Sequence, residues 1–217
     1  MKRLVLYGVG SPLVADAQEA CARGAIGIVA GVANVEGRVW VDDTVRVVRA
    51  EQIDAELTMH PVACVLFTPA WRRRAFEDAY AHGFASDATL VDPTSIVARS
   101  ASVGAGTFVN AGCTIAAGCV IEARVLVNRS ASIGHHARLR AYASIGPGAI
   151  LTGAVDVGRG ATIGAGAILL PEVTIGDNAV VAAGSLVREP VPPNTMVGGN
   201  PCRVLREHVA GYHGDGV

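Results

Sequence analysis

The sequence ASIGHHARLRAYASIGPGAILTGAVDVGRGATIGAGAILL, residues 131–170, shows a six-residue pattern that extends from residue 97 to residue 187. Every sixth position in this interval is Val, Ile or Leu, sixteen times without a break, and this one register holds 16 of its 26 Val, Ile and Leu residues. The residue four places after each of them is small or β-branched. A helix has a period of 3.6 residues, so this period of six indicates a solenoid instead.

A period of six suits a chain that forms a strand of two or three residues and then turns a corner. Three such sides close a triangular coil of about 18 residues, and coils stack at the strand spacing of about 4.8 Å. Each aliphatic residue then lies above its counterpart in the preceding coil. Residues 97–187 therefore predict an all-β parallel helix of about five coils.

The first 90 residues instead alternate short aliphatic runs with amphipathic stretches, which is typical of a small α/β unit. Its parallel strands would leave a crevice at their carboxyl ends, where small ligands bind. The run of arginines at 72–74 is interpreted as the solvated face of a helix, with contact to a phosphate as the alternative. The predicted strands are 2–7, 26–30, 38–41 and 63–67, and the predicted helices are 13–23, 48–57 and 70–82.

Composition excludes several classes of protein. With 51% hydrophobic and 17% charged residues the chain is not disordered, and a net charge of −1 favours neither a nucleic-acid nor a membrane partner. There is no apolar run long enough for a membrane span and no signal segment at the start, so we expect a cytoplasmic protein. Five scattered cysteines without a CxxC pair predict reduced thiols and no metal site.

One polar interruption in the solenoid could carry chemistry. The run NRSASIGHH, residues 128–136, places His135 and His136 directly after an inward Ile, at a corner where side chains point outward. An imidazole can take the proton from an attacking amine or hydroxyl group, as direct acyl transfer requires. The alternative interpretation is that both are solvated corner residues. The remaining histidines lie beside turns or in the last ten residues, which we expect to be frayed.

The hexads resemble those of the hexapeptide-repeat acyltransferases, and residues 1–207 together resemble the two-domain sugar acetyltransferases of the NeuD and PglD type. The shared motifs are Asn-x6-His, at Asn128 and His135, and the closing sequence VGGNPCRV, residues 197–204. The resemblance implies a Rossmann-like α/β substrate domain at 1–92, a left-handed parallel β-helix at 93–205 and a tail at 206–217. It also implies acetyl-CoA as co-substrate and a homotrimer with the helices side by side.

The resemblance assigns roles to individual residues. His135 would be the general base, with Asn128 and His136 organising the catalytic site. Gly153 would lie beside the thioester, Ala165 and Ala183 along the pantetheine arm, and Ser144 where relatives carry a second cofactor-contacting histidine. The loop GVGSP, residues 8–12, would bind substrate through Gly8, Gly10 and Ser11.

This chain also departs from those relatives. It has Pro12 where they have a contacting histidine in the loop, and it lacks their pair of aspartates after the second strand, where it reads AGVAN at 30–34. The implied function is acetyl-CoA-dependent N- or O-acetylation of a sugar, which could be an amino, sialic-type or nucleotide-linked sugar. The alternative is a non-catalytic hexapeptide-repeat scaffold or ligand-binding protein.

Overall fold

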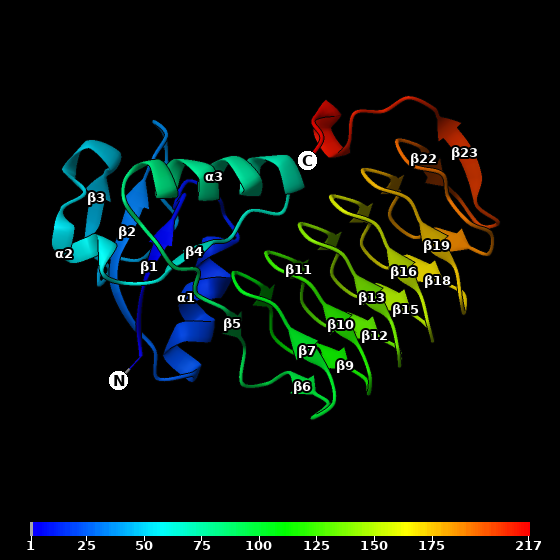
Figure 1. The fold of residues 1–217 in the computed structure, drawn as a ribbon, viewed down its shortest axis with the longest axis horizontal. Helices are drawn as coiled ribbons and strands as arrows, with labels where there is room; N and C mark the ends of the chain where they lie inside the picture. The colour runs from blue at the N-terminus through cyan, green and yellow to red at the C-terminus, as the bar shows by residue number, and fades with distance from the viewer. Residues whose placement is uncertain (1) are drawn as a thin grey trace.

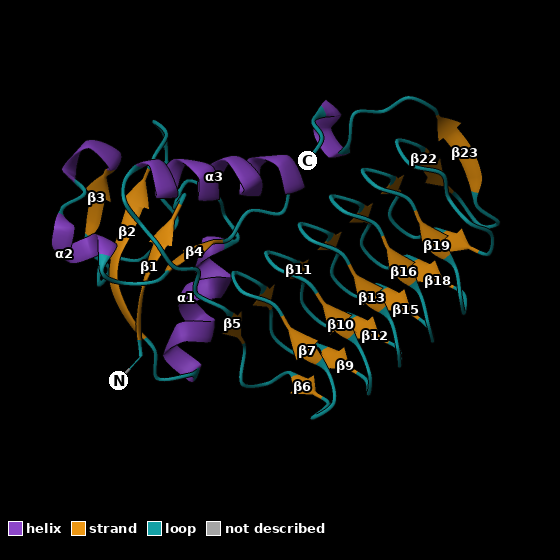
Figure 2. Cartoon of the chain, viewed as in Figure 1, coloured by secondary structure: helices purple, strands orange, loops and turns teal. Residues whose placement is uncertain are grey.

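The computed structural model describes residues 2–217, which form a small α/β unit followed by a triangular column of short strands (Figure 1). The α-helices lie in the α/β unit, the column is built of strands and turns, and one short helix lies near the C-terminus (Figure 2). No helix within residues 2–217 has the length and apolar character that crossing a membrane requires.

The α/β unit is built on a parallel sheet with strand order β3-β2-β1-β4. Residues of β1 alternate between its two faces, because Leu4 and Leu6 pack with α1, whereas Val5 and Tyr7 pack with α3. The two helices therefore cover opposite faces of the sheet. The elements are β1 (Arg3–Tyr7), α1 (Val14–Arg23), β2 (Gly27–Ala33), β3 (Val47–Arg49), η1 (Ala50–Gln52), α2 (Ala55–Thr58), β4 (Val62–Cys64) and α3 (Pro69–Ala81).

Two predicted elements of this unit are wrong. No strand forms at 38–41, where the Arg38 guanidinium instead lies 3.9 Å from the centre of the Trp40 ring. The predicted helix at 48–57 begins as β3, since Val48 is buried against β2 opposite Val32. After the single 3-10 turn η1, an α-helix starts only at Ala55; Asp54 Oδ1 accepts a hydrogen bond from the Leu57 N–H and so caps its first turn.

The column consists of three parallel sheets, and strands that are 18 residues apart pair in register, as Ile133 does with Leu151. The eight-stranded sheet contains β5 (Leu90–Val91), β8 (Phe108–Val109), β11 (Leu126–Val127), β14 (Ser144–Ile145), β17 (Thr162–Ile163), β20 (Val180–Val181), β22 (Met196–Gly198) and the antiparallel β23 (Arg203–Arg206). The six-stranded sheet contains β6 (Ile96–Val97), β9 (Thr114–Ile115), β12 (Ser132–Ile133), β15 (Ile150–Leu151), β18 (Ile168–Leu169) and β21 (Leu186–Val187). The five-stranded sheet contains β7 (Ser102–Val103), β10 (Val120–Ile121), β13 (Arg138–Leu139), β16 (Asp156–Val157) and β19 (Thr174–Ile175).

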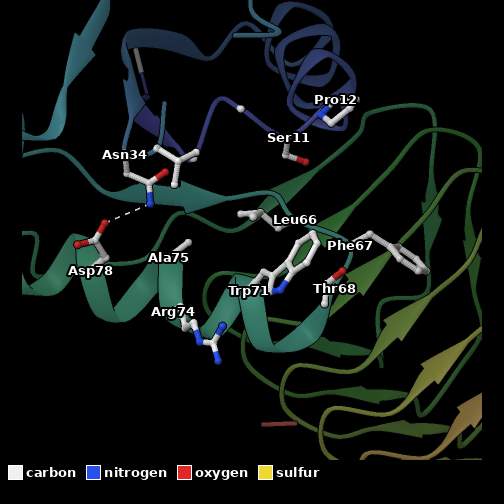
Figure 3. Close-up of a pocket in the computed structure, with 13 residues that line it drawn as sticks. Ser11, Pro12, Asn34, Leu66, Phe67, Thr68, Trp71, Arg74, Ala75 and Asp78 are labelled. Atoms are coloured by element: carbon white, nitrogen blue, oxygen red, sulfur yellow. Dashed lines mark hydrogen bonds between the residues drawn. The ribbon is translucent and has the colours of Figure 1, made fainter. Parts of the chain in front are cut away.

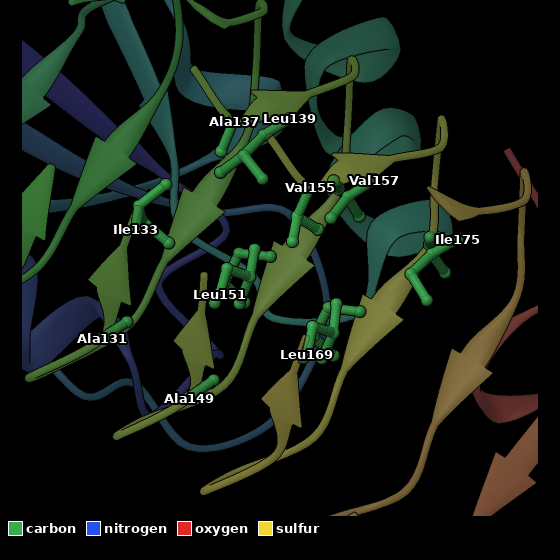
Figure 4. Close-up of a cluster of buried hydrophobic side chains, with 14 of the residues drawn as sticks. Ala131, Ile133, Ala137, Leu139, Ala149, Leu151, Val155, Val157, Leu169 and Ile175 are labelled. Carbon is green, nitrogen blue, oxygen red and sulfur yellow. The ribbon is translucent and has the colours of Figure 1, made fainter. Parts of the chain in front are cut away.

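The hexad side chains fill the interior of the column, as predicted. Ile133, Leu151 and Leu169 stack coil upon coil and are at most 1% exposed (Figure 4). The small residues four places later, such as Ala137 and Val155, are equally buried beside the corners. The period of six thus corresponds to one side of the triangle. The column already includes Leu90–Val91, which pairs with β8.

The α/β unit covers the outer face of the eight-stranded sheet, and Arg72 of α3 joins the two. The prediction that Arg72 is solvated is wrong, because it is 1% exposed. Its guanidinium donates hydrogen bonds to the carbonyls of Tyr142 (2.7 Å) and Arg124 (2.9 Å), among others, and to Ser144 Oγ (3.0 Å). Burial lowers the pKa of Arg72 to about 9, so it is still charged at neutral pH and these carbonyls balance the charge.

The expectation of a frayed tail is also wrong. The short helix η2 (Tyr212–Gly214) lies beside the start of α3 (Figure 1). The Val217 N–H donates to Asn178 Oδ1 of the column at 2.9 Å, and Asp215 pairs with Arg74 of α3. The last residues therefore bridge the column and the α/β unit.

Candidate functional site

A cavity of about 580 Å³ lies at the carboxyl ends of β1, β2 and β4, beside the start of α3 (Figure 3). The structure brings together here all three residues predicted to bind substrate, Gly8, Gly10 and Ser11. Its location matches the crevice expected of a parallel sheet. The other lining residues are Pro12, Asn34, Val35, Leu66, Phe67, Thr68, Trp71, Arg74, Ala75 and Asp78.

The polar end of the cavity is organised around Asp78. Asp78 Oδ2 accepts a hydrogen bond from Asn34 Nδ2 at 3.1 Å (Figure 3) and another from the Tyr7 hydroxyl at 2.7 Å. Burial, together with the carboxylate of Asp78, raises the pKa of Tyr7, so the hydroxyl remains a donor. These two donors occupy Oδ2, whereas Oδ1 lies 3.5 Å from His82 Nδ1 and can still accept a hydrogen bond from a ligand.

Sequence reasoning missed the cavity residues of α3, which are Trp71, Arg74 and Asp78. They are spaced three and four residues apart, so they share one face of the helix. That spacing was a usable signal. It was obscured because the neighbouring Arg72 and Arg73 suggested a uniformly solvated helix.

The two histidines lie at a different place, the corner between the six-stranded and five-stranded sheets. His135 and His136 follow β12 and are both exposed. Their Nδ1 atoms are 3.2 Å apart, within hydrogen-bond distance, and the ring planes are inclined at 79°. One Nδ1 can therefore donate a proton to the other, which orients both rings.

Each imidazole lies over a glycine of a neighbouring coil. A Cβ added at Gly153, in the next coil, would lie 2.6 Å from Cε1 and 2.7 Å from Nε2 of His135. A Cβ added at Gly118, in the previous coil, would lie 2.8 Å from Cδ2 of His136. The rings thus occupy space that any other residue would fill, and the structure brings Gly153 to His135.

The other predicted site residues lie elsewhere in the chain. Asn128 is on the corner between the eight-stranded and six-stranded sheets, where its Oδ1 accepts a hydrogen bond from Asn110 Nδ2 at 3.0 Å. Ala165 and Ala183 are exposed on this same corner, one and two coils beyond residue 147. Within one chain, Asn128, Ala165 and Ala183 are therefore at one edge of the six-stranded sheet, and His135 is at the opposite edge.

Ser144 is not accessible to a ligand in this structure. Its side chain is fully buried between the column and the α/β unit. The hydroxyl donates a hydrogen bond to the Phe67 carbonyl at 2.5 Å and accepts one from Arg72. A cofactor could contact the Ser144 hydroxyl only if Phe67 and Arg72 moved, so Ser144 is not part of the proposed site.

The six-stranded sheet, between these two corners, has an uncovered apolar face. Ile96, Ile150 and Ile168 point outward from it and are 71%, 43% and 37% exposed. By contrast, Phe108 and Leu126, which point outward from the eight-stranded sheet, are buried against the α/β unit. Within residues 2–217, no three His, Cys, Asp or Glu side chains are grouped as a metal ion would require.

Residues 154–189 match the family described as bacterial transferase hexapeptide (six repeats). No curated protein sequence shows a significant match to the chain. The predicted hexapeptide repeat and the resemblance to hexapeptide-repeat acyltransferases are confirmed by this match and by the solved structures that follow.

Three solved structures are similar over nearly their whole length. PerB from Caulobacter crescentus, in complex with CoA and GDP-perosamine, is 27% identical with a TM-score of 0.83, covering 95% of this chain and 98% of that one. The acetyltransferase domain of PglB from Neisseria gonorrhoeae, in complex with acetyl coenzyme A, is 28% identical with a TM-score of 0.82, covering 94% and 99%. WeeI from Acinetobacter baumannii, at 17% identity and a TM-score of 0.77 over 94% and 100%, shares the fold.

Proposed function

Because residues 154–189 match the hexapeptide transferase family and the chain is similar to solved acetyltransferase structures, we propose that the chain is a hexapeptide-repeat acyltransferase that transfers an acetyl group from acetyl-CoA to an amino or hydroxyl group of a nucleotide-linked sugar. The observation that carries the proposal is the imidazole of His135, which lies over Gly153 with its Nδ1 next to that of His136. The similar structures hold CoA, acetyl-CoA or GDP-perosamine, which supports this choice of substrates.

His135 acts as the general base. In the tautomer that this role requires, His135 carries its proton on Nδ1 and donates it to His136 Nδ1, 3.2 Å away, which leaves the lone pair of His135 Nε2 free to accept a proton. As the sugar amine or hydroxyl attacks the thioester carbonyl, Nε2 takes its proton. The new bond to the acetyl carbon forms, the carbon–sulfur bond breaks, and the CoA thiolate leaves and receives the proton from His135. His136 therefore does what a carboxylate commonly does for a catalytic histidine.

A single chain cannot complete this site, because its cavity and His135 lie on different sides of the column. The α/β unit covers the eight-stranded sheet, and His135 is at the corner opposite that sheet. The apolar outer face of the six-stranded sheet, with Ile96 and Ile150, points to association of copies through this face. We therefore keep the homotrimer as part of the proposal.

Three-fold symmetry would bring the separated residues together. When three copies turn the same face to a common axis, one edge of each face meets the other edge of its neighbour. His135 of one chain would then approach the corner that carries Asn128, Ala165 and Ala183 in the next chain. At that corner, Asp16 of α1 accepts hydrogen bonds from Arg129 (2.6 Å) and Asn110 (2.9 Å).

In this arrangement the acceptor-binding unit and the catalytic histidine belong to neighbouring copies. The cavity loop leads directly into α1, so the acceptor-binding unit of one chain adjoins the corner that meets the neighbour's histidine. The acceptor would be bound by residues 1–92 of one copy and acetylated at His135 of the next. The Rossmann-like character of this unit, the left-handed winding of the column and a cytoplasmic location belong to the same proposal.

Two variants test the roles of the histidines. His135→Ala removes the base, so turnover should fall about 100-fold or more while acetyl-CoA still binds and the oligomer stays intact. His136→Ala is the matched control: it removes a neighbouring imidazole of equal exposure but leaves the base, so its loss should be smaller. Unchanged turnover of the His135 variant would refute the mechanism.

The alternative, a non-catalytic scaffold, predicts a different result. A scaffold has no reason to bind acetyl-CoA, so calorimetric titration of the wild-type protein with acetyl-CoA separates the two functions. Absence of binding would favour the scaffold.

A further inference from the structure

The end of the chain contacts three residues that line the cavity. The His213 ring stacks on Trp71, with centroids 5.4 Å apart and planes inclined at 16°. Tyr212 meets the edge of Phe67 at 5.7 Å. Asp215 accepts two hydrogen bonds from the guanidinium of Arg74, at 2.7 and 3.0 Å. Residues 212–215 thus support three of the side chains that line the cavity.

This segment is also anchored to the column on both of its sides. Before it, the Val209 N–H donates to the Asn194 carbonyl at 2.9 Å, and Asn194 Nδ2 donates back to the Val209 carbonyl at 2.9 Å. After it, the Val217 N–H donates to Asn178 Oδ1. A segment held at two points can hold other side chains in place, which a free tail cannot do.

The residues that it contacts need such support. The Trp71 residue is 47% exposed and the side chain of Arg74 is 58% exposed, so neither is fixed by burial. A long exposed side chain loses conformational freedom when it binds a ligand, and a side chain already restrained loses less. Stacking on His213 and the paired hydrogen bonds to Asp215 supply that restraint in advance.

The supported residues have the chemistry that a nucleotide requires. Trp71 offers a flat aromatic surface to a base, Arg74 offers a planar cation to a phosphate, and Asp78 offers a carboxylate oxygen to an N–H or hydroxyl donor. Figure 3 shows Trp71 and Arg74 on neighbouring turns of α3 along the cavity.

We propose that residues 212–215 are a positioning element of the acceptor site, which holds Trp71 and Arg74 ready for the base and phosphate of a nucleotide-linked sugar. The inference rests on the proposed function. It adds a part of the chain that lies outside both the α/β unit and the repeats, and it assigns that part to recognition of the acceptor.

Calorimetric titration with GDP, UDP and CMP tests the proposal. His213→Ala and Asp215→Asn should each weaken binding of the nucleotide that the wild type binds best by about 3- to 10-fold. His213→Phe keeps a ring against Trp71 and should restore the affinity. Glu207→Gln is the matched control, because it removes a charge from an exposed residue of the same tail. Affinity for acetyl-CoA should be unchanged in all four variants.

Two results would overturn the inference, and they differ. If His213→Ala and Asp215→Asn melt at lower temperature but bind the nucleotide as the wild type does, the segment is only a brace between the domains. If the wild type binds none of the three nucleotides yet binds acetyl-CoA, the nucleotide-linked acceptor of the proposed function is wrong, and this inference fails with it.

Discussion

Replacing Gly153 by alanine should disable His135 without unfolding the protein. The added Cβ would lie 2.6 Å from Cε1 and 2.7 Å from Nε2 of the His135 ring. Carbon atoms in contact prefer about 3.5–4.0 Å, so the ring must move by about 1 Å. Because His135 is exposed it is free to move, and the free energy of unfolding should change by no more than about 0.5 kcal/mol.

The effect on turnover should be much larger. Displacing a reacting group by about 1 Å can lower the rate on the order of 100-fold. The assay is the release of the CoA thiol, measured with a thiol reagent at saturating acetyl-CoA, together with thermal unfolding. Gly83→Ala is the control: this residue follows the C-cap of α3, is far from His135 and His136 in the chain, and has a φ of +95°. That variant should lose about 1 kcal/mol of stability and keep its turnover.

The two variants therefore predict opposite patterns. If Gly153→Ala has wild-type turnover, the imidazole over Gly153 is not in the reacting position, and the assignment of the base fails. If Gly153→Ala instead unfolds, the contact between His135 and Gly153 stabilises the column and does not serve catalysis.

Two further predictions concern assembly and stability. Ile150→Arg places a charge on the apolar face of the six-stranded sheet, so the proposed trimer should dissociate in sedimentation and turnover should be lost; a monomeric wild type would contradict this. Asp92→Asn should lower the free energy of unfolding by about 1–3 kcal/mol at pH 7, because the buried carboxylate accepts hydrogen bonds from Arg23 and Thr94. Burial alone would raise the pKa of Asp92, but these bonds outweigh it and hold the pKa below 3.8. The stabilisation is therefore present above pH 3.8 and lost as the pH falls further, so acid titration of stability should bring wild type and variant together.

The column could be predicted because its information is local and repeated. Each hexad places one aliphatic residue inward. Because three hexads close one coil of 18 residues, residues such as Ile145 and Ile163 stack on each other. The crevice of the α/β unit could be predicted for a similar reason, since parallel strands leave one wherever they end. The segment at 48–57 was mistaken for a helix because Val48 fits either pattern, and only its pairing with β2 decides.

Contacts between distant parts of the chain could not be predicted. Nothing in the sequence around Arg72 shows that carbonyls some 70 residues later will surround it. The same holds for Asp215, whose partner Arg74 is 141 residues away. The Asn128 and His135 motif could be recognised in the sequence. Its spacing along the chain does not show that the two residues lie at different corners of the column, at opposite edges of the six-stranded sheet. Their proposed meeting depends on a second copy.

The bonds made by Arg72 have a consequence for how the acceptor reaches its destination. Because the guanidinium of Arg72 is hydrogen-bonded to main-chain carbonyls of the column, the α/β unit is held in place and cannot rotate to carry the acceptor to the histidine. The acceptor itself must therefore span the distance between the cavity that binds it and the histidine at which it reacts. The protein would in this way select its acceptor by length, accepting a sugar that is linked to a nucleotide and not the free sugar.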